Sequence, residues 1–142
     1  MNRDPSCIFC RIVSGEAPAA RLQEDALTVS ILDIRPVSEG HALVLTREHF
    51  ENVYEATPDA LAAVARASKR VAHALRDTLR PDGLSIVQSN GEAASQSIFH
   101  YHMHLIPRRA GSSWTLHGRR RVADAELEQL ARRIAEHLPA AD

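Results

Sequence analysis

Three of the eight histidines of the chain occupy alternate positions in the run His100-Tyr101-His102-Met103-His104. Successive side chains of a β-strand point to opposite faces, so in a strand the three imidazoles would share one face, with Tyr101 and Met103 on the core side. Histidine favours neither close burial nor strand formation strongly, so this spacing indicates chemistry. Two kinds remain open here: alternate histidines could bind a catalytic metal, or one imidazole could be a nucleophile that its neighbours tune.

The segment before this run favours the nucleophile. Residues 89–97 read Ser-Asn-Gly-Glu-Ala-Ala-Ser-Gln-Ser, a loop of small residues, hydroxyl groups and backbone N–H groups that can approach phosphate oxygens. A neutral imidazole is a good nucleophile toward phosphorus, and surrounding N–H donors would stabilise charge on the equatorial oxygens. A catalytic metal is disfavoured, because alternate strand positions without a nearby carboxylate pattern make a poor facial site.

Two cysteines lie three residues apart, at Cys7 and Cys10. In a reducing compartment such a pair is seldom a structural disulfide, so the spacing indicates metal or redox chemistry. The redox alternative requires a thioredoxin-like βαβ context, which is not evident. Zinc needs two further ligands, and His49 and His100 are available. The four side chains would form a closed tetrahedron, hence a structural zinc site, with reduced metal-free thiols as the alternative.

A small set of helices and strands must position these residues, and 142 residues suit one domain. The long helix has the clearest ends, with Thr57 as N-cap, Pro58 as its first residue and a turn at Pro81-Asp82-Gly83. Strands segregated from helices predict an α+β fold with an antiparallel sheet, in one domain over residues 1–142. Within it we expect residues 1–6 to be mobile and residues 109–142 to form a C-terminal extension. We expect a short helix over residues 7–15, strands over 27–33, 41–46, 84–88 and 98–107, a long helix over 58–79 and a terminal helix over 123–138.

Charge and hydropathy exclude several classes of partner. A formal net charge of -1 gives no argument for nucleic acid or for an acidic membrane surface. Arg119-Arg120-Arg121 is the best candidate for a local basic patch, but a solvated turn beside a helix is the better interpretation. The chain has no apolar run long enough to cross a bilayer and no apolar signal core behind its N-terminus. We therefore expect a cytoplasmic protein that binds neither nucleic acid nor membrane.

The segment Gln96–Arg108, which contains the histidine run, resembles the signature of the histidine triad (HIT) family, most closely its bacterial, zinc-containing Hint-like branch. The likeness continues through Leu32–Pro36, Gly40–Val44 and Cys7–Cys10. The resemblance implies an α+β, HIT-like fold, in which an antiparallel sheet of about five strands carries one long helix and a C-terminal helix. It also implies a homodimer that pairs its long helices and central strands, and it supports zinc as a structural cofactor.

The resemblance further implies an enzyme that hydrolyses or transfers a nucleoside monophosphate from a nucleotide–X substrate, where X is an amine, a phosphate or a sulfate. His102 would attack the α-phosphorus and form a nucleotidyl-imidazole, from which water would release AMP or GMP. The alternative is a nucleotide-binding regulatory protein with little turnover. The residues name neither the physiological substrate nor the preferred base.

Other site residues are also assigned by the resemblance. His104 would contact phosphate oxygens, and His41 would lie beside the triad that His100 begins. Asp33 would accept hydrogen bonds from the ribose hydroxyls, which suits a carboxylate. The set of nucleotide-binding residues that the resemblance implies is Asp33, Ser89, Ser95, Gln96, Ser97, His102 and His104.

The sequence departs from the usual family pattern at two of these positions. Many relatives have Gly where Ser95 stands, and a side chain there would narrow the phosphate loop. Many have Asn or Gln where Ser89 stands, and the adjacent Asn90 would point to the other face of an extended segment. Both changes bear on substrate choice and rate more than on reaction class. Trp114, in the loop after the last strand, is expected to pack on its own domain.

Overall fold

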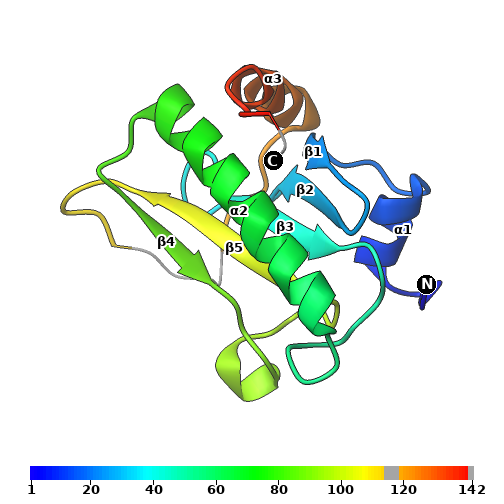
Figure 1. Ribbon diagram of the computed structural model, residues 1–142. Helices are drawn as coiled ribbons and strands as arrows, with labels where there is room; N and C mark the ends of the chain where they lie inside the picture. The colour runs from blue at the N-terminus through cyan, green and yellow to red at the C-terminus, as the bar shows by residue number, and fades with distance from the viewer. Residues whose placement is uncertain (114–118, 141–142) are drawn as a thin grey trace.

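The fold is built on one antiparallel sheet with the strand order β1-β2-β3-β5-β4 (Figure 1). The structure is a computed structural model that describes residues 1–113 and 119–140, so the expectation for Trp114 lies outside the described residues. The strands are β1 Arg21–Glu24, β2 Thr28–Leu32, β3 Ala42–Thr46, β4 Gly83–Val87 and β5 His102–Arg108. The helices are α1 Ile8–Ser14, α2 Pro58–Leu79, the 3-10 turn η1 Glu92–Ala94 and α3 Asp124–Ala135. The predicted α+β, HIT-like class is confirmed.

The helices cover opposite faces of the sheet, as the alternation of strand side chains requires. One core cluster joins α2 to Ala42, Val44 and Leu105, and Figure 1 shows α2 lying across that face. The second core cluster joins Phe9 and Ile12 of α1 to alternate residues of β2 and β3, which are Val29, Ile31, Leu43 and Leu45. His104 is paired with Leu43 and His102 with Leu45 across the β3–β5 ladder. Both histidines therefore lie on the α1 face.

Helix α2 follows its sequence signals closely. The side chain of Thr57 accepts a hydrogen bond from the N–H of Ala60, and Pro58 is the first helical residue. The helix ends at Arg80, which adopts a left-handed conformation before Pro81. The residues that α2 buries are small or β-branched along most of its length, so that the helix can lie close to the sheet.

One strand was not predicted, and the start of another was predicted wrongly. Strand β1 was not expected, because its four residues contain a single apolar side chain, Leu22, and give no clear alternation. Strand β5 begins at His102 and not at residue 98, because residues 98–101 bend away from the ladder. There the N–H of Tyr101 instead donates to the carbonyl of Phe50, at 2.7 Å. His100 therefore lies outside the strand, and its ring need not share a face with His102.

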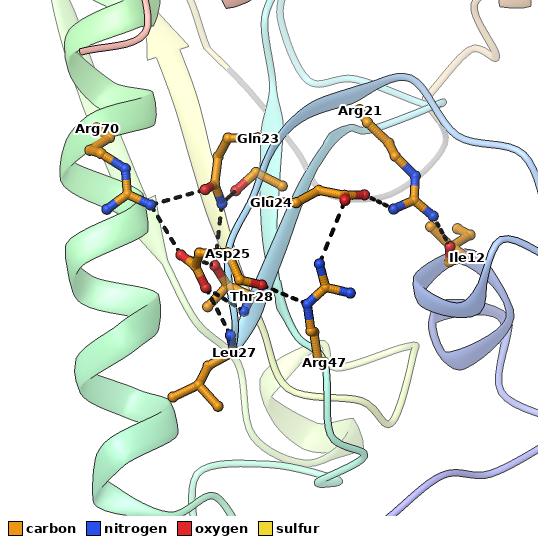
Figure 2. Close-up of polar contacts among 10 residues, drawn as sticks. Ile12, Arg21, Gln23, Glu24, Asp25, Leu27, Thr28, Arg47 and Arg70 are labelled. Atoms are coloured by element: carbon orange, nitrogen blue, oxygen red, sulfur yellow. Dashed lines mark hydrogen bonds and ion pairs between the residues drawn. The ribbon is translucent and has the colours of Figure 1, made fainter. Parts of the chain in front are cut away.

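A polar network fastens the β1–β2 hairpin to α2 (Figure 2). Arg70 of α2 donates to Gln23, at 2.9 Å, and to the carboxylate of Asp25, at 3.0 Å. The other oxygen of Asp25 accepts the backbone N–H groups of Leu27 and Thr28, at 2.9 and 2.8 Å. These hydrogen bonds hold the pKa of Asp25 below its usual value although burial opposes the charge. The network fixes the start of β2, the strand that leads to Asp33.

The described C-terminal residues return to the sheet, as the predicted terminal helix requires. Helix α3 buries Leu127, Ala131 and Ile134 against the cluster beneath α2. Just before α3, the N–H of Val122 donates to the carbonyl of Ile34, at 2.9 Å. This bond places residues 119–122 beside the turn that connects β2 to β3.

The first residues of the chain also make specific contacts. Asn2 accepts a hydrogen bond from the N–H of His49, at 2.8 Å, and its amide donates back to the carbonyl of His49, at 3.1 Å. The mobility of residues 1–6 stays a prediction, and these contacts weigh against it. No helix among the described residues has the length and hydropathy needed to span a bilayer.

Candidate active site

His102 is held as a neutral imidazole with one nitrogen free. Its Nδ1 lies 2.7 Å from the carbonyl oxygen of His100. A carbonyl only accepts, so Nδ1 carries the proton and Nε2 keeps its lone pair. Burial lowers the pKa of His102, which favours the neutral form, and the ring packs edge-on against Phe9. This is the protonation state that a nucleophilic nitrogen requires.

His41 and His104 form a second chain of defined tautomers. The N–H of Val37 donates to Nδ1 of His41, at 3.0 Å, so the proton of His41 resides on Nε2. That N–H donates to Nδ1 of His104, at 2.9 Å, which leaves the proton of His104 on its outer nitrogen, Nε2. Burial lowers the pKa of His41 to about 4 and that of His104 to about 3, so both rings are neutral at pH 7. His104 therefore presents an N–H donor.

A cavity of about 40 Å³ lies against both triad histidines of β5. This is more than the space one water molecule needs, and its size suits a small oxyanion. Three hydroxyl-bearing residues of the loop before β5 contribute to it. The cavity is lined by Ser89, Ser95, Gln96, Ser97, His102, His104 and Arg119.

The loop around this cavity is shaped by side-chain hydrogen bonds to its own backbone. Gln96 is buried and accepts the N–H of Gly91 at 2.7 Å, while its amide donates to the carbonyl of Glu51 at 2.6 Å. Asn90 accepts the N–H of Val53, at 2.8 Å, which directs its side chain toward that segment. The side chains of Gln96 and Asn90 thus hold the loop, and Ser89 and Ser97 stand at the cavity.

Ser95 adopts a left-handed conformation, with φ at 73°. This region favours glycine because a Cβ atom is crowded there. The position therefore has a structural reason to carry Gly, and its serine brings both backbone strain and an extra side chain to the cavity.

Asp33 stands at the end of β2, beside the histidines. One oxygen accepts the N–H of Arg35, at 2.8 Å, and the other lies 3.7 Å from Nε2 of His41. Nη1 of Arg119 donates to this second oxygen, at 3.3 Å. Arg119 was missed as a site residue. Arg119 belongs to a run of three arginines that also suits a solvated turn, and no local sequence pattern shows that the chain folds back onto Asp33 at this point.

A larger cavity, of about 700 Å³, lies on the other side of Asp33 and His41, between the β2–β3 turn and α3. Its walls carry charge of both signs, from Glu39 and Glu126 and from Arg120 and Arg133. The triad residues His102 and His104 belong to the small cavity and do not line the large one.

The four predicted zinc ligands converge, although they come from separate parts of the chain. The Sγ–Nδ1 distances are 3.4 Å from Cys7 to His100, 3.5 Å from Cys10 to His100 and 3.3 Å from Cys10 to His49, and the two Nδ1 atoms lie 3.3 Å apart. Usual zinc bond lengths in a tetrahedron give edges of about 3.3 Å between two nitrogens and about 3.5 Å between nitrogen and sulfur. The donor atoms thus fit a zinc ion.

The protonation of these ligands supports the same fit. Nε2 of His100 lies 2.6 Å from the carbonyl of Thr46 and must donate to it, which leaves Nδ1 bare toward the cysteines. Burial lowers the pKa of His100 to about 4 and, without a metal, raises the pKa of the Cys10 thiol. A bound cation would oppose the second effect by stabilising the thiolate.

A catalytic metal on the three triad histidines does not fit the described geometry. The ring of His100 faces the cysteines, whereas His102 and His104 face the small cavity. A second group, formed by Asp33, His41 and His104, comes within metal-binding distance. In it the Nε2 proton of His41 is already shared with His104, so the two rings do not offer two free lone pairs there.

Residues 14–111 match the HIT domain, and the chain belongs to the HIT family. Protein hit of Bacillus subtilis is 39% identical over 97% of this chain and 98% of its own length. Adenosine 5'-monophosphoramidase hnt1 of Schizosaccharomyces pombe is 40% identical over 72% of this chain and 74% of its own. Adenylylsulfatase HINT3 of Arabidopsis thaliana is 35% identical over 93% of this chain and 69% of its own.

Solved structures show the same likeness. A Hit-like protein from Bartonella henselae superposes with a TM-score of 0.90 at 30% identity, over 97% of this chain and 100% of the other. A zinc-bound histidine triad family protein from Mycobacterium smegmatis superposes with a TM-score of 0.82 at 40% identity, over 93% and 92% of the two chains. The fold and the family are thereby established, and a structural zinc site is compatible with both.

Proposed function

We propose that the chain is a hydrolase or transferase that cleaves a phosphorus–nitrogen or phosphoanhydride bond of a nucleotide substrate through a covalent nucleotidyl-His102 intermediate. The observation that carries the proposal is the hydrogen bond between Nδ1 of His102 and the carbonyl of His100, because it leaves the Nε2 lone pair free beside an oxyanion-sized cavity. The product is a nucleoside monophosphate, AMP or GMP.

The reaction balances in two displacements at phosphorus. The Nε2 lone pair of His102 attacks the α-phosphorus, and the bond to the leaving group breaks with its electron pair going to the leaving atom, which takes a proton from water when it is an amine. The imidazole gains positive charge, and the carbonyl of His100 stabilises the Nδ1–H as this happens. Water then attacks the phosphorus and loses a proton to the solvent, and the electron pair of the breaking bond returns to Nε2.

Neighbouring groups bind and orient the phosphate in this scheme. The outer N–H of His104, set by the bond from His41, donates to a phosphate oxygen. The hydroxyl of Ser97 approaches the same group. The N–H groups of Ser95 and Gln96 already donate to the carbonyls of Glu92 and Gly91, so they shape the loop. Asp33 accepts the ribose hydroxyls. Each of these roles pairs a donor with an anion or an acceptor with a hydroxyl.

Cys7, Cys10, His49 and His100 would hold a zinc ion in this protein. Zinc would supply structural rigidity and no step of the reaction, because a closed tetrahedron has no open position. It would fix the ring of His100, and the backbone of the same residue orients His102.

The relatives support an enzyme. Two of them are named as an adenosine monophosphoramidase and an adenylylsulfatase, which are hydrolases of the proposed kind. The alternative, a nucleotide-binding protein with little turnover, has one observation in its favour, the strained Ser95 at the cavity. A cytoplasmic homodimer remains part of the proposal.

The decisive experiment incubates the protein with adenosine 5'-phosphoramidate and follows AMP release by chromatography. His102→Ala should lower turnover by at least about a thousandfold, because the attacking atom is lost, while AMP binding stays measurable by calorimetry. His73→Ala is the matched control, since it removes a histidine from α2, far along the chain from the triad.

Three results would contradict the proposal. AMP binding without release by the wild-type protein would favour the regulatory alternative. Turnover that survives in His102→Ala would exclude the covalent route. Turnover that a chelator abolishes and added metal restores at once, with no change in folding, would indicate a catalytic metal.

A further inference from the structure

The histidine cavity poses a charge problem for a nucleotide substrate. A substrate phosphate is anionic, and the serine and glutamine side chains that line the cavity carry no charge. Arg119 is the one cationic residue in the described lining. A guanidinium keeps its charge at any physiological pH and offers donors in a geometry that suits phosphate oxygens.

Arg119 is built into the site by several contacts. It donates to Asp33 at 3.3 Å, to the carbonyl of Arg35 and to Nδ1 of His41 at 3.3 Å. The side chains of Arg119 and Asp33 are 17% and 12% exposed, so their ion pair is largely shielded from water. The bond from Val122 to Ile34 fixes the backbone three residues later. The guanidinium is therefore positioned, and not a freely solvated surface cation.

The same ion pair conflicts with the role proposed for Asp33. Arg119 occupies one acceptor site on one carboxylate oxygen and the N–H of Arg35 occupies one on the other, so fewer acceptor sites remain for the two ribose hydroxyls. A nucleotide resolves the conflict when its phosphate takes over the guanidinium, because one anion then replaces another beside Arg119 and the carboxylate becomes available.

We propose that Arg119 is a substrate-binding residue that leaves its ion pair with Asp33 and pairs with the phosphate end of the substrate instead. Arg119 thereby biases the site toward nucleotides whose leaving group is itself an anion, such as sulfate or phosphate. When an anhydride P–O bond breaks, negative charge develops on the leaving oxygen, and a nearby guanidinium stabilises it. An amine leaves neutral after taking a proton and gains less. This inference rests on the proposed function and deepens it by naming a substrate class.

The test compares adenosine 5'-phosphosulfate with adenosine 5'-phosphoramidate in steady-state assays. Arg119→Ala should lower kcat/KM for the phosphosulfate about tenfold more than for the phosphoramidate, since the charge-dependent contact is lost. Arg119→Lys should recover part of that difference. Arg121→Ala is the matched control: it removes the same charge from the same segment, but Arg121 pairs with Asp124 and lines neither cavity. Its selectivity should stay within about twofold of the wild type.

Equal losses on both substrates, or no loss at all, would overturn the selectivity. The exchange itself is tested without turnover, by calorimetry with AMP and with adenosine. Arg119→Ala should weaken AMP binding and leave adenosine binding unchanged or tighter, because Asp33 is released. Parallel weakening of both would show a merely structural role and overturn the inference. A wild-type protein that binds AMP in this pattern but hydrolyses neither substrate would refute the proposed function and leave the binding role of Arg119 standing.

Discussion

At the scale of single residues, one backbone group sets the tautomer of each of three histidines. The carbonyl of His100 fixes His102, the carbonyl of Thr46 fixes His100, and the N–H of Val37 fixes His41. The side chains alone could take either tautomer, so the distinction between a nucleophile, a ligand and a donor arises from the backbone around them.

Burial of neutral histidines predicts a pH dependence of stability. The pKa of His41 falls from 6.5 in the unfolded chain to about 4 in the fold, so between these values the unfolded chain binds a proton that the folded chain does not. The free energy of unfolding should therefore fall as the pH drops from 6.5 toward 4, by about 3 kcal/mol for this residue, and should not change above 6.5 on its account.

Urea unfolding at several pH values between 7 and 4.5 measures this effect. His41→Gln should show a shallower fall in stability over that range, whatever its stability at pH 7. Charged and titratable neighbours of His41, namely Asp33, His102, His104 and Arg119, stay in place in the variant. Curves of wild type and variant that run parallel from pH 6.5 to 4.5 would refute the burial of a neutral His41.

Residue-level analysis of the sequence predicted most residues of the candidate site but not the role of Arg119 or the strained backbone of Ser95. The triad, the cysteine pair and Asp33 carry local motifs. In the structure His102 and His104 line the small cavity, Asp33 lies beside His41, and the cysteine pair meets His49 and His100. The strained backbone of Ser95 has no local signature of its own, because serine is common in loops. Arg119 forms its ion pair with Asp33 only because the chain between them folds back, and no short sequence pattern encodes that path.

At the scale of elements, strong local signals were reliable and weak ones were not. Helix α2 has a cap, a proline and a long apolar stripe, and its ends agree with the prediction. Strand β1 is polar, and it is stabilised by its neighbour β2 and by the network around Asp25 (Figure 2). Its own sequence pattern therefore does not predict a strand. The bend at residues 98–101 was also not predicted, because tertiary contacts of Tyr101 and His100 create it.

Helix α1 leads to a prediction about metal. It carries Cys10 and begins after Cys7, and the other two ligands come from elsewhere in the chain, so a bound zinc ion would tie α1 to the loops that hold His49 and His100. Cys7→Ser should abolish stoichiometric zinc in mass-spectrometric metal analysis and lower Tm by about 5–10 °C. The thiol is a ligand only in the folded chain, so metal and stability should be lost together.

Stripping zinc from the wild-type protein with a chelator provides the control. It should reproduce the lower Tm, and the same chelator should have no effect on the Tm of Cys7→Ser. A wild-type protein that is purified without zinc and takes none up would contradict the assignment and leave reduced thiols in its place.

At the scale of the whole molecule, the sheet ends in an open edge. Strand β4 pairs with β5 on one side only, and its residue Ile86 is 52% exposed. An exposed apolar edge strand favours pairing with another chain. The predicted homodimer pairs its long helices and central strands, and two β4 edges that paired about a twofold axis would lie at the centre of the joint sheet, in the symmetric manner of most homo-oligomers.

Sedimentation velocity tests the dimer. Ile86→Asp should shift the protein from dimer to monomer, because it places a charge in the apolar edge. Tyr54→Ser, which changes a more exposed aromatic side chain outside the sheet, should leave the dimer intact. A wild-type monomer at micromolar concentration would refute the prediction, and so would an Ile86→Asp variant that stays dimeric.

The two tasks of His100 are performed by different parts of one amino acid. Its imidazole faces the sulfur atoms, and its main-chain oxygen accepts the Nδ1 proton of His102, the proposed nucleophile. Every amino acid has a main-chain carbonyl oxygen, whereas few have a side-chain ring that can bind a metal. Replacement of this histidine would therefore remove the proposed zinc site and leave the main-chain oxygen beside His102, provided that other packing keeps the bend, so a zinc-free descendant would be reachable in one mutational step.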